Sequence, residues 1–133
     1  MEDLSQWDVV IVDDEPDNVG VVELVFQFHG ATVRTATSAA DCLKLIEKTI
    51  PTVLLVDIQM PVMSGYELIQ VIRSRAEWQT MPVIAVTAHV KDEDREQIMT
   101  AGFDGYIGKP ISVTTLADEV LDILRDRKQR HDD

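Results

Sequence analysis

Short apolar segments alternate with longer segments of helical periodicity along most of this chain. Three apolar runs, rich in Val and Ile, have the length of buried strands, and two weaker candidates are more polar. The runs cover residues 7–12, 52–57 and 81–87, and the weaker candidates cover residues 31–36 and 104–109. Because each strand–helix crossover returns the chain to the same end of a sheet, this alternation predicts an α/β fold with five parallel strands and helices on both faces. The two polar strands are expected at or near the sheet edges.

The helical segments carry signals that mark their ends. Capping residues or a proline mark the starts, and a glycine marks one stop. The signals are Pro16 near a first turn with Gly30 as its stop, Ser38 with Asp41, Ser64 with Glu67, and Ser112 just after Pro110. Five helices are therefore expected between and after the strands.

Two segments have little to hold them against a core. The helix expected over residues 92–101 offers only Ile98, Met99 and Ala101 for burial, so we expect it to be the most weakly anchored helix. Residues 126–133 form a charged tail that is expected to fray.

Composition limits the class of protein. With 133 residues, 45% apolar and 27% charged, the chain fits one globular domain over residues 1–133, with its core at about 7–125. Its formal charge of −12 repels nucleic-acid phosphates, which argues against direct nucleic-acid binding. No signal peptide or membrane-span pattern is present, so we expect no membrane contact and a cytoplasmic protein. The single cysteine, Cys42, lies in a helical pattern and is expected to be a buried apolar residue.

Charged and hydroxyl side chains follow the predicted strands at the points where the strands end. Asp13 and Asp14 come after the first strand, Asp57 ends the third, Thr87 ends the fourth, and Lys109 follows the fifth. In open parallel sheets, ligands bind beyond the carboxyl ends of the strands. We therefore expect these five residues, here called the rim, to meet at one edge of the sheet.

The rim chemistry favours a metal ion and a phosphoryl group. Neighbouring carboxylates repel one another, and their hard oxygen atoms favour Mg²⁺ as the cation between them. Asp57 can then act as a nucleophile on phosphorus, with Lys109 and Thr87 contacting phosphoryl oxygens. Each residue alone also has an ordinary structural interpretation as a turn, strand or surface residue. Glu15, beside Pro16, fits a helix N-terminus as well as it fits support of the metal.

Four segments together resemble the receiver domain of two-component response regulators, in particular the single-domain members that are similar to chemotaxis regulators. The segments are VDDEPDN, VDIQMPVMSGYEL, VIAVTA and AGFDGYIGKP, and the similarity runs from about Val9 to the last helix. None of the four segments is specific for this family alone, but their order and spacing together are specific for it. The resemblance implies a doubly wound, flavodoxin-like three-layer sandwich with strand order 2-1-3-4-5.

The resemblance also implies roles for the acidic residues. Asp57 would accept a phosphoryl group from a phosphohistidine on a sensor histidine kinase or a histidine phosphotransfer protein. Asp14, Asp57 and the backbone carbonyl of Gln59 would bind Mg²⁺ directly, and Asp13 would act mainly through bound water. Gln59 and His89 would occupy positions that influence hydrolysis of the phosphoryl group.

A conformational switch is implied in the same way. Thr87 and Lys109 would sense the phosphoryl group, and Tyr106 would be the switch aromatic. Phosphorylation would draw Thr87 toward the site, and Tyr106 would rotate into the space that Thr87 leaves. This would reshape the surface of the fourth helix, the fifth strand and the fifth helix. A cis peptide before Pro110 is implied as well.

The chain is thus expected to be a phosphoacceptor signalling domain, not an enzyme, that assists its own phosphorylation and dephosphorylation. Its partners would be the phosphodonor and an unidentified downstream protein, and a phosphorylation-dependent homodimer is compatible with the resemblance. Three alternatives stay open: an aspartyl-nucleophile, Mg²⁺-dependent phosphatase, a degenerate receiver that only binds a partner, and a flavodoxin-like nucleotide carrier. The carrier fits least well, because Asp-Asp-Glu-Pro after the first strand has the wrong charge for a phosphate loop.

Overall fold

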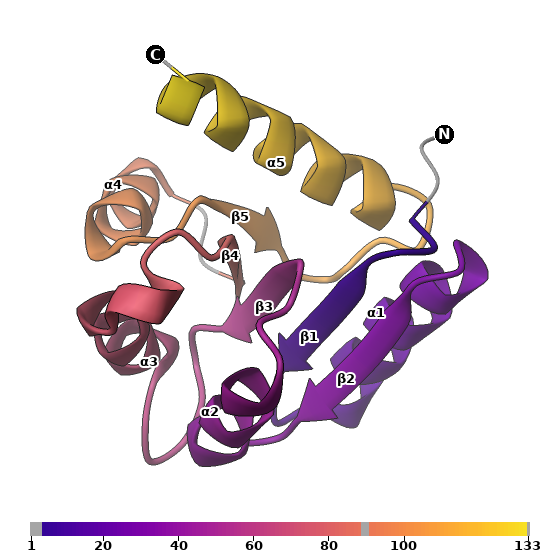
Figure 1. The fold of residues 1–133 in the computed structure, drawn as a ribbon, viewed down its shortest axis with the longest axis horizontal. Helices are drawn as coiled ribbons and strands as arrows, with labels where there is room; N and C mark the ends of the chain where they lie inside the picture. The colour runs from indigo at the N-terminus through magenta and orange to yellow at the C-terminus, as the bar shows by residue number, and fades with distance from the viewer. Residues whose placement is uncertain (1–3, 89–90, 133) are drawn as a thin grey trace.

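A five-stranded parallel sheet forms the centre of the molecule in the computed structural model, which describes residues 4–88 and 91–132 (Figure 1). The strand order is β2-β1-β3-β4-β5, which confirms the predicted doubly wound sheet. The strands are β1 (Asp8–Val12), β2 (Thr32–Ala36), β3 (Val53–Asp57), β4 (Val83–Thr87) and β5 (Gly105–Gly108). The two polar strands, β2 and β5, lie at the edges as expected.

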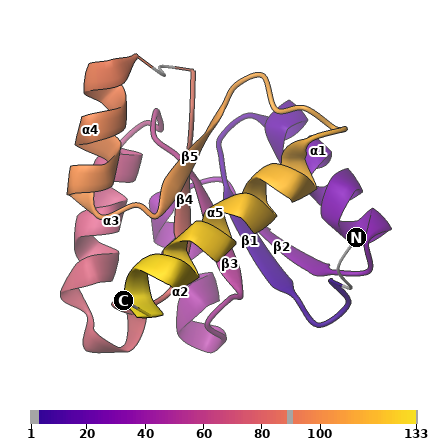
Figure 2. The same cartoon turned by 90° about the horizontal axis from the view of Figure 1, so that it is seen from above.

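Helices cover both faces of the sheet and complete the three layers (Figure 2). They are α1 (Pro16–Phe28), α2 (Ala39–Lys48), α3 (Gly65–Ser74), the short 3₁₀ helix η1 (Ala76–Trp78), α4 (Asp92–Ala101) and α5 (Leu116–Asp132). The apolar side chains of α1 and α5 pack on one face, and those of α2, α3 and α4 pack on the other. Among the described residues, no helix is long and apolar enough to cross a membrane.

The three central strands supply apolar side chains to both faces. Every residue of β3 and β4 is buried, and along β1 alternate residues face opposite helical layers, so that Val10 and Val12 pack on one side while Val9 and Ile11 pack on the other. Burial on both faces explains why these runs are continuously apolar in the sequence. It also leaves the polar residues of these strands only at the strand ends.

The predicted starts of α1, α2 and α3 agree with the structure, whereas α5 begins at Leu116, four residues after Ser112. Pro16 is the first residue of α1, and Ser64 and Glu67 form a reciprocal capping box at the start of α3. The expectation for α4 was partly wrong, because Ile98 is buried but Met99 is 40% exposed. Adjacent positions on a helix point about 100° apart, so both cannot face the sheet. With one fully buried residue, α4 is weakly anchored.

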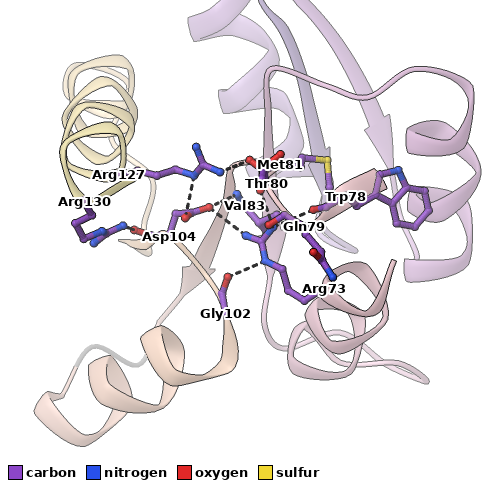
Figure 3. A network of polar contacts seen from close by, with 10 residues as sticks. All are labelled: Arg73, Trp78, Gln79, Thr80, Met81, Val83, Gly102, Asp104, Arg127 and Arg130. Atoms are coloured by element: carbon purple, nitrogen blue, oxygen red, sulfur yellow. Dashed lines mark hydrogen bonds and ion pairs between the residues drawn. The ribbon is translucent and has the colours of Figure 1, made fainter. Parts of the chain in front are cut away.

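The charged tail of the sequence forms the end of helix α5. Helix α5 continues to Asp132, and its last turns are joined to the body of the molecule by arginine side chains (Figure 3). Arg127 pairs with the Asp104 carboxylate at 3.0 Å and also donates to the carbonyl of Thr80, while Arg130 donates to the carbonyl of Asp104 at 3.2 Å. The composition suggested a solvated segment, but two of its charged residues, Arg127 and Arg130, contact partners that are distant in the sequence.

Asp104 is the centre of this network and directly precedes β5. Its nearly buried carboxylate accepts from Arg73 at 3.1 Å and from the backbone N–H of Val83 at 2.8 Å, besides pairing with Arg127. Arg73 also donates to four backbone carbonyls, those of Trp78, Gln79, Met81 and Gly102, at 2.8–3.1 Å. One carboxylate therefore joins α3, β4, β5 and α5 at the end of the sheet opposite the rim.

Replacement of Asp104 by Ala should lower the free energy of unfolding by about 3 kcal/mol, because Arg73 and the Val83 N–H lose a hydrogen-bond acceptor and Arg127 loses its ion-pair partner. Urea unfolding followed by circular dichroism measures this change. The matched control is Asp126→Ala, which removes an exposed carboxylate from α5 and should change the free energy by less than about 0.5 kcal/mol. Equal effects of the two substitutions would contradict a central role for Asp104.

Candidate functional site

The structure brings the five rim residues together at the carboxyl ends of the strands. In the sheet register, Val12 lies beside Val56, and Thr87 lies beside Gly108, so β1, β3, β4 and β5 end at the same level. The side chains of Asp13, Asp57 and Thr87 are 0%, 1% and 2% exposed, respectively. The parallel topology thus concentrates charged and polar groups in a nearly buried position at one edge.

Lys109 faces the acidic side chains as the sequence predicted. Its ammonium Nζ lies 3.2 Å from Asp57 Oδ1, 3.6 Å from Asp13 Oδ2 and 3.8 Å from Glu15 Oε1. Burial lowers the pKa of Lys109, but the attraction of Asp13, Asp57 and Glu15 outweighs burial and raises the pKa above its ordinary value. Lys109 therefore carries a permanent positive charge beside Asp57.

Asp13, Asp14 and Asp57 offer the ligand set of a divalent cation. One carboxylate oxygen from each residue lies within 4.8 Å of the other two. Asp13 Oδ2 and Asp57 Oδ2 are buried and accept no hydrogen bond, although buried carboxylate oxygens normally have a partner. Two such oxygens, beside the exposed Asp14, fit a hard cation such as Mg²⁺ that would also be reached by water.

The surroundings of Asp57 disfavour the ionised form of its side chain. Burial is the main reason that its pKa rises to about 6, and repulsion from Asp13 adds to the effect. The Gln59 N–H, which donates to Asp57 Oδ1 at 3.0 Å, and the ammonium group of Lys109 oppose this rise. The site therefore disfavours a bare carboxylate at Asp57, and a bound cation would remove that penalty.

The loop from β3 to α3 closes tightly directly after Asp57. The Gly65 N–H donates to the carbonyl of Ile58 at 2.9 Å, which closes the loop directly after the strand. A Cβ atom at Gly65 would lie 2.6 Å from the Cα atom of Ile58 and 2.9 Å from the carbonyl oxygen of Asp57. Only glycine permits this close approach, so Gly65 helps to fix the backbone of Asp57.

The remaining predicted residues lie around β4 and β5. The Thr87 carbonyl accepts the backbone N–H of Lys109 at 2.8 Å, and the peptide before Pro110 is cis, as expected. Tyr106 on β5 is half-buried, and the Arg95 guanidinium carbon of α4 lies 5.6 Å from its ring centroid. The contact with Arg95 was missed, because no sequence pattern pairs those two positions. His89 lies outside the described residues.

Comparisons with known proteins agree with this geometry. The family model for the response regulator receiver domain matches residues 9–121. An uncharacterized 14.6 kDa protein of Leptolyngbya boryana is 38% identical over 84% of this chain and 85% of that protein. A probable cyclic di-GMP phosphodiesterase of Vibrio cholerae is 33% identical over 98% of this chain, and the response regulator SaeR of Staphylococcus aureus is 30% identical over 92%. This chain spans only 29% and 53% of those last two proteins, respectively.

Solved structures show the same fold. A putative response regulator from Chloroflexus aurantiacus superposes with a TM-score of 0.82 at 30% identity, covering 90% of this chain and 98% of that one. The chemotaxis response regulator CheY4 of Vibrio cholerae superposes with a TM-score of 0.83 at 26% identity, covering 88% and 98% of the two chains.

Fold and rim together define a doubly wound signalling domain with an acidic cation site at its strand ends. The chain belongs to the response regulator receiver family of two-component systems. Receiver domains are phosphorylated by histidine kinases or phosphotransfer proteins and bind Mg²⁺ at an acidic site, and the cluster of Asp13, Asp14 and Asp57 is consistent with such a phosphoacceptor site. Family membership favours a receiver over the flavodoxin-like carrier and the phosphatase.

Substitution of Asp57 by Asn should stabilise the metal-free protein at neutral pH by about 1–2 kcal/mol, because it removes a carboxylate that the fold disfavours. The folded pKa of about 6 lies above the unfolded value near 3.8, so ionisation destabilises the fold as pH rises through this interval. Urea unfolding of both proteins from pH 4 to pH 7 in a chelator measures the difference.

The expected result is a stability difference that is small at pH 4 and grows until about pH 6. Added Mg²⁺ should then stabilise the wild-type protein more than the Asn variant, because ligand binding to the folded state raises its stability. A stability difference that does not change with pH would contradict a raised pKa at Asp57.

Proposed function

We propose that Asp57 is the phosphoacceptor of this receiver domain. The proposal is based on the contacts that the two oxygen atoms of its carboxylate make. Asp57 Oδ1 is held by the Gln59 N–H and by Lys109 at 3.2 Å, whereas the buried Oδ2 accepts no hydrogen bond. A buried carboxylate that is held in a fixed position beside a permanent cation, and whose lone pairs are not all taken by hydrogen bonds, is suited to attack phosphorus.

The reaction exchanges one bond to phosphorus for another. A carboxylate oxygen of Asp57 forms the new P–O bond, and the P–N bond to the imidazole of the donor breaks. The electron pair of that bond stays on the imidazole nitrogen, which takes a proton from solvent. The ammonium group of Lys109 balances negative charge on the phosphoryl oxygens, and the hydroxyl group of Thr87 would donate to another of them.

Asp14, Asp57 and the backbone carbonyl of Gln59 would hold Mg²⁺ directly, and Asp13 would act through bound water. The bound ion would neutralise charge between the phosphoryl group and the carboxylates. The Asp13 side chain is fixed by a hydrogen bond, in which Oδ1 accepts the Glu15 N–H at 2.8 Å. This bond orients Oδ2 in the cluster.

The phosphodonor would be a sensor histidine kinase or a histidine phosphotransfer protein. Downstream, the domain would act on a protein target through the surface of α4, β5 and α5, and phosphorylation would govern any homodimer formed by this surface. Two features support this surface. Helix α4 has a single fully buried residue, and Tyr106 connects β5 to α4 through the contact with Arg95.

A degenerate receiver without phosphorylation is the second candidate, but the complete set of Asp13, Asp14, Asp57, Thr87 and Lys109 favours a functional acceptor. The domain would assist its own phosphorylation and dephosphorylation through these residues. It would not turn over substrate as a separate enzyme does.

Incubation with acetyl phosphate and Mg²⁺ should add one phosphoryl group to the wild-type chain, as measured by intact-mass spectrometry. The adduct should be absent from Asp57→Asn and should be lost from the wild type when the metal is chelated. The matched control is Asp17→Asn, which alters an acidic residue in the first turn of α1 and should keep the adduct. An adduct that persists in Asp57→Asn would place the acceptor elsewhere.

Binding of a phosphate mimic such as beryllium fluoride should shift backbone NMR signals along α4 and β5, because the switch couples Thr87 to Tyr106. The Thr87→Val variant keeps the shape of the side chain but lacks the hydroxyl group. It should retain shifts near Asp57 and lose those along α4 and β5. Wild-type shifts confined to the loops that carry the rim acids would contradict the switch.

A further inference from the structure

Glu15, in the loop between β1 and α1, has a carboxylate that neither of its sequence-based interpretations explains. As a helix N-terminal residue it occupies the N-cap position of α1, but its side chain makes no capping hydrogen bond. As support for a metal ion it would belong to the carboxylate cluster, yet among the described residues that cluster consists of Asp13, Asp14 and Asp57. The role of Glu15 therefore depends on what its side chain contacts.

The two carboxylate oxygens of Glu15 have different partners. Oε2 accepts a hydrogen bond from the Asn18 side-chain amide of α1 at 3.3 Å. Oε1 lies 3.8 Å from the ammonium Nζ of Lys109. The same Nζ lies 3.6 Å from Asp13 and 3.2 Å from Asp57, so Glu15 is the third carboxylate around one ammonium group.

The backbone holds Glu15 in place beside Lys109. The Glu15 N–H donates to Asp13 Oδ1 at 2.8 Å. Because Pro16 follows, Glu15 is confined to an extended conformation, and its φ of −99° and ψ of 116° agree with this restriction. With its backbone fixed and its side chain bound by Asn18, Glu15 keeps a defined position although its side chain is 63% exposed.

Glu15 differs from the other two partners of Lys109 in its relation to the cation site. Asp13 and Asp57 are nearly buried and belong to the carboxylate cluster, whereas Glu15 is exposed and lies outside it. A bound Mg²⁺ would neutralise charge on Asp13 and Asp57 but would leave Glu15 ionised. Glu15 is therefore the carboxylate that continues to attract Lys109 when a phosphoryl group arrives.

We propose that Glu15 is a positioning residue, which holds the ammonium group of Lys109 and thereby sets the balance between cation binding and phosphoryl binding at the rim. The inference rests on the proposed function, because it assumes that a phosphoryl group is received beside Lys109. By sharing Lys109, Glu15 leaves Asp13 and Asp57 more available to Mg²⁺. The same contact makes Lys109 less available to the phosphoryl oxygens.

The test is the Glu15→Gln variant, which keeps the shape of the side chain and removes its charge. The dissociation constant for Mg²⁺ should rise by about threefold, as expected for an exposed ion pair. The dissociation constant for beryllium fluoride, measured at saturating Mg²⁺, should fall by about threefold. Both are measured by titrations followed through backbone NMR signals. Opposite changes for a cation and an anion are the signature of a charge, because general damage to the rim would weaken both.

Salt provides a further readout that a purely structural role would not change. Both differences between Glu15→Gln and the wild type should be present at about 0.1 M sodium chloride and largely lost at about 1 M, where the Debye length is only about 3 Å.

A double-mutant cycle tests the contribution of Asn18. Asn18→Ala releases the Glu15 carboxylate, so it should shift both dissociation constants in the same directions as Glu15→Gln, but by less. It should have no effect in the Glu15→Gln background, because its influence on Lys109 passes through the charge of Glu15.

The matched control is Asp17→Asn. Asp17 is exposed in the first turn of α1, so its replacement removes one negative charge close to Glu15 in the sequence. Both dissociation constants should stay at their wild-type values.

Several results would overturn the inference. They are weaker binding of both ligands by Glu15→Gln, unchanged binding of both, and differences that are equally large at both salt concentrations. In each case the wild type still binds beryllium fluoride, so the proposed function stands. A wild type that gains no adduct from acetyl phosphate would instead remove the proposed function, and this inference with it.

Discussion

The central constraint in this molecule is the placement of like charges at one edge of a parallel sheet. Asp13 and Asp57 are nearly inaccessible to solvent, and each has an oxygen that accepts no hydrogen bond. Their mutual repulsion and their burial destabilise the folded state. Lys109, whose Nζ lies 3.2 Å from Asp57 Oδ1, offsets part of this destabilisation. Burial and the repulsion from Asp13 are not fully offset, so the pKa of Asp57 stays raised. The same excess of negative charge favours binding of a cation.

The two ends of the sheet are built in opposite ways. At the rim, carboxylates exceed the cations that face them, and buried oxygens are left without hydrogen bonds. At the other end, the Asp104 carboxylate is shared by Arg73, Arg127 and the Val83 N–H, and the guanidinium groups also cap backbone carbonyls. The domain thus has one end at which ion pairs and hydrogen bonds join several elements, and one end at which carboxylates are in excess. Helix α4 has one buried residue, fewer than α1, α2 or α3, so we expect its displacement to cost the least free energy.

Local backbone requirements next to Asp57 serve the same purpose. The close approach at Gly65 sets the position of the strand end, and the strained turn at Val62 exposes an apolar side chain beside it. Both features lie within eight residues of Asp57. One loop therefore combines support of the Asp57 backbone with a strained, exposed turn.

Much of this arrangement is determined by the sequence alone. Apolar runs buried on both faces specify the central strands, and the topology rule for parallel sheets then brings Asp13, Asp57 and Lys109 to one edge, because parallel strands end at the same side. The contacts of Asp104, the partners of Arg127 and Arg130 at the end of α5, and the pairing of Arg95 with Tyr106 were decided only by the tertiary structure. These depend on which charged side chains, far apart in the chain, meet a partner when the layers pack. Periodicity records which face of an element is buried, but it carries no information on the partners of charged residues outside that face.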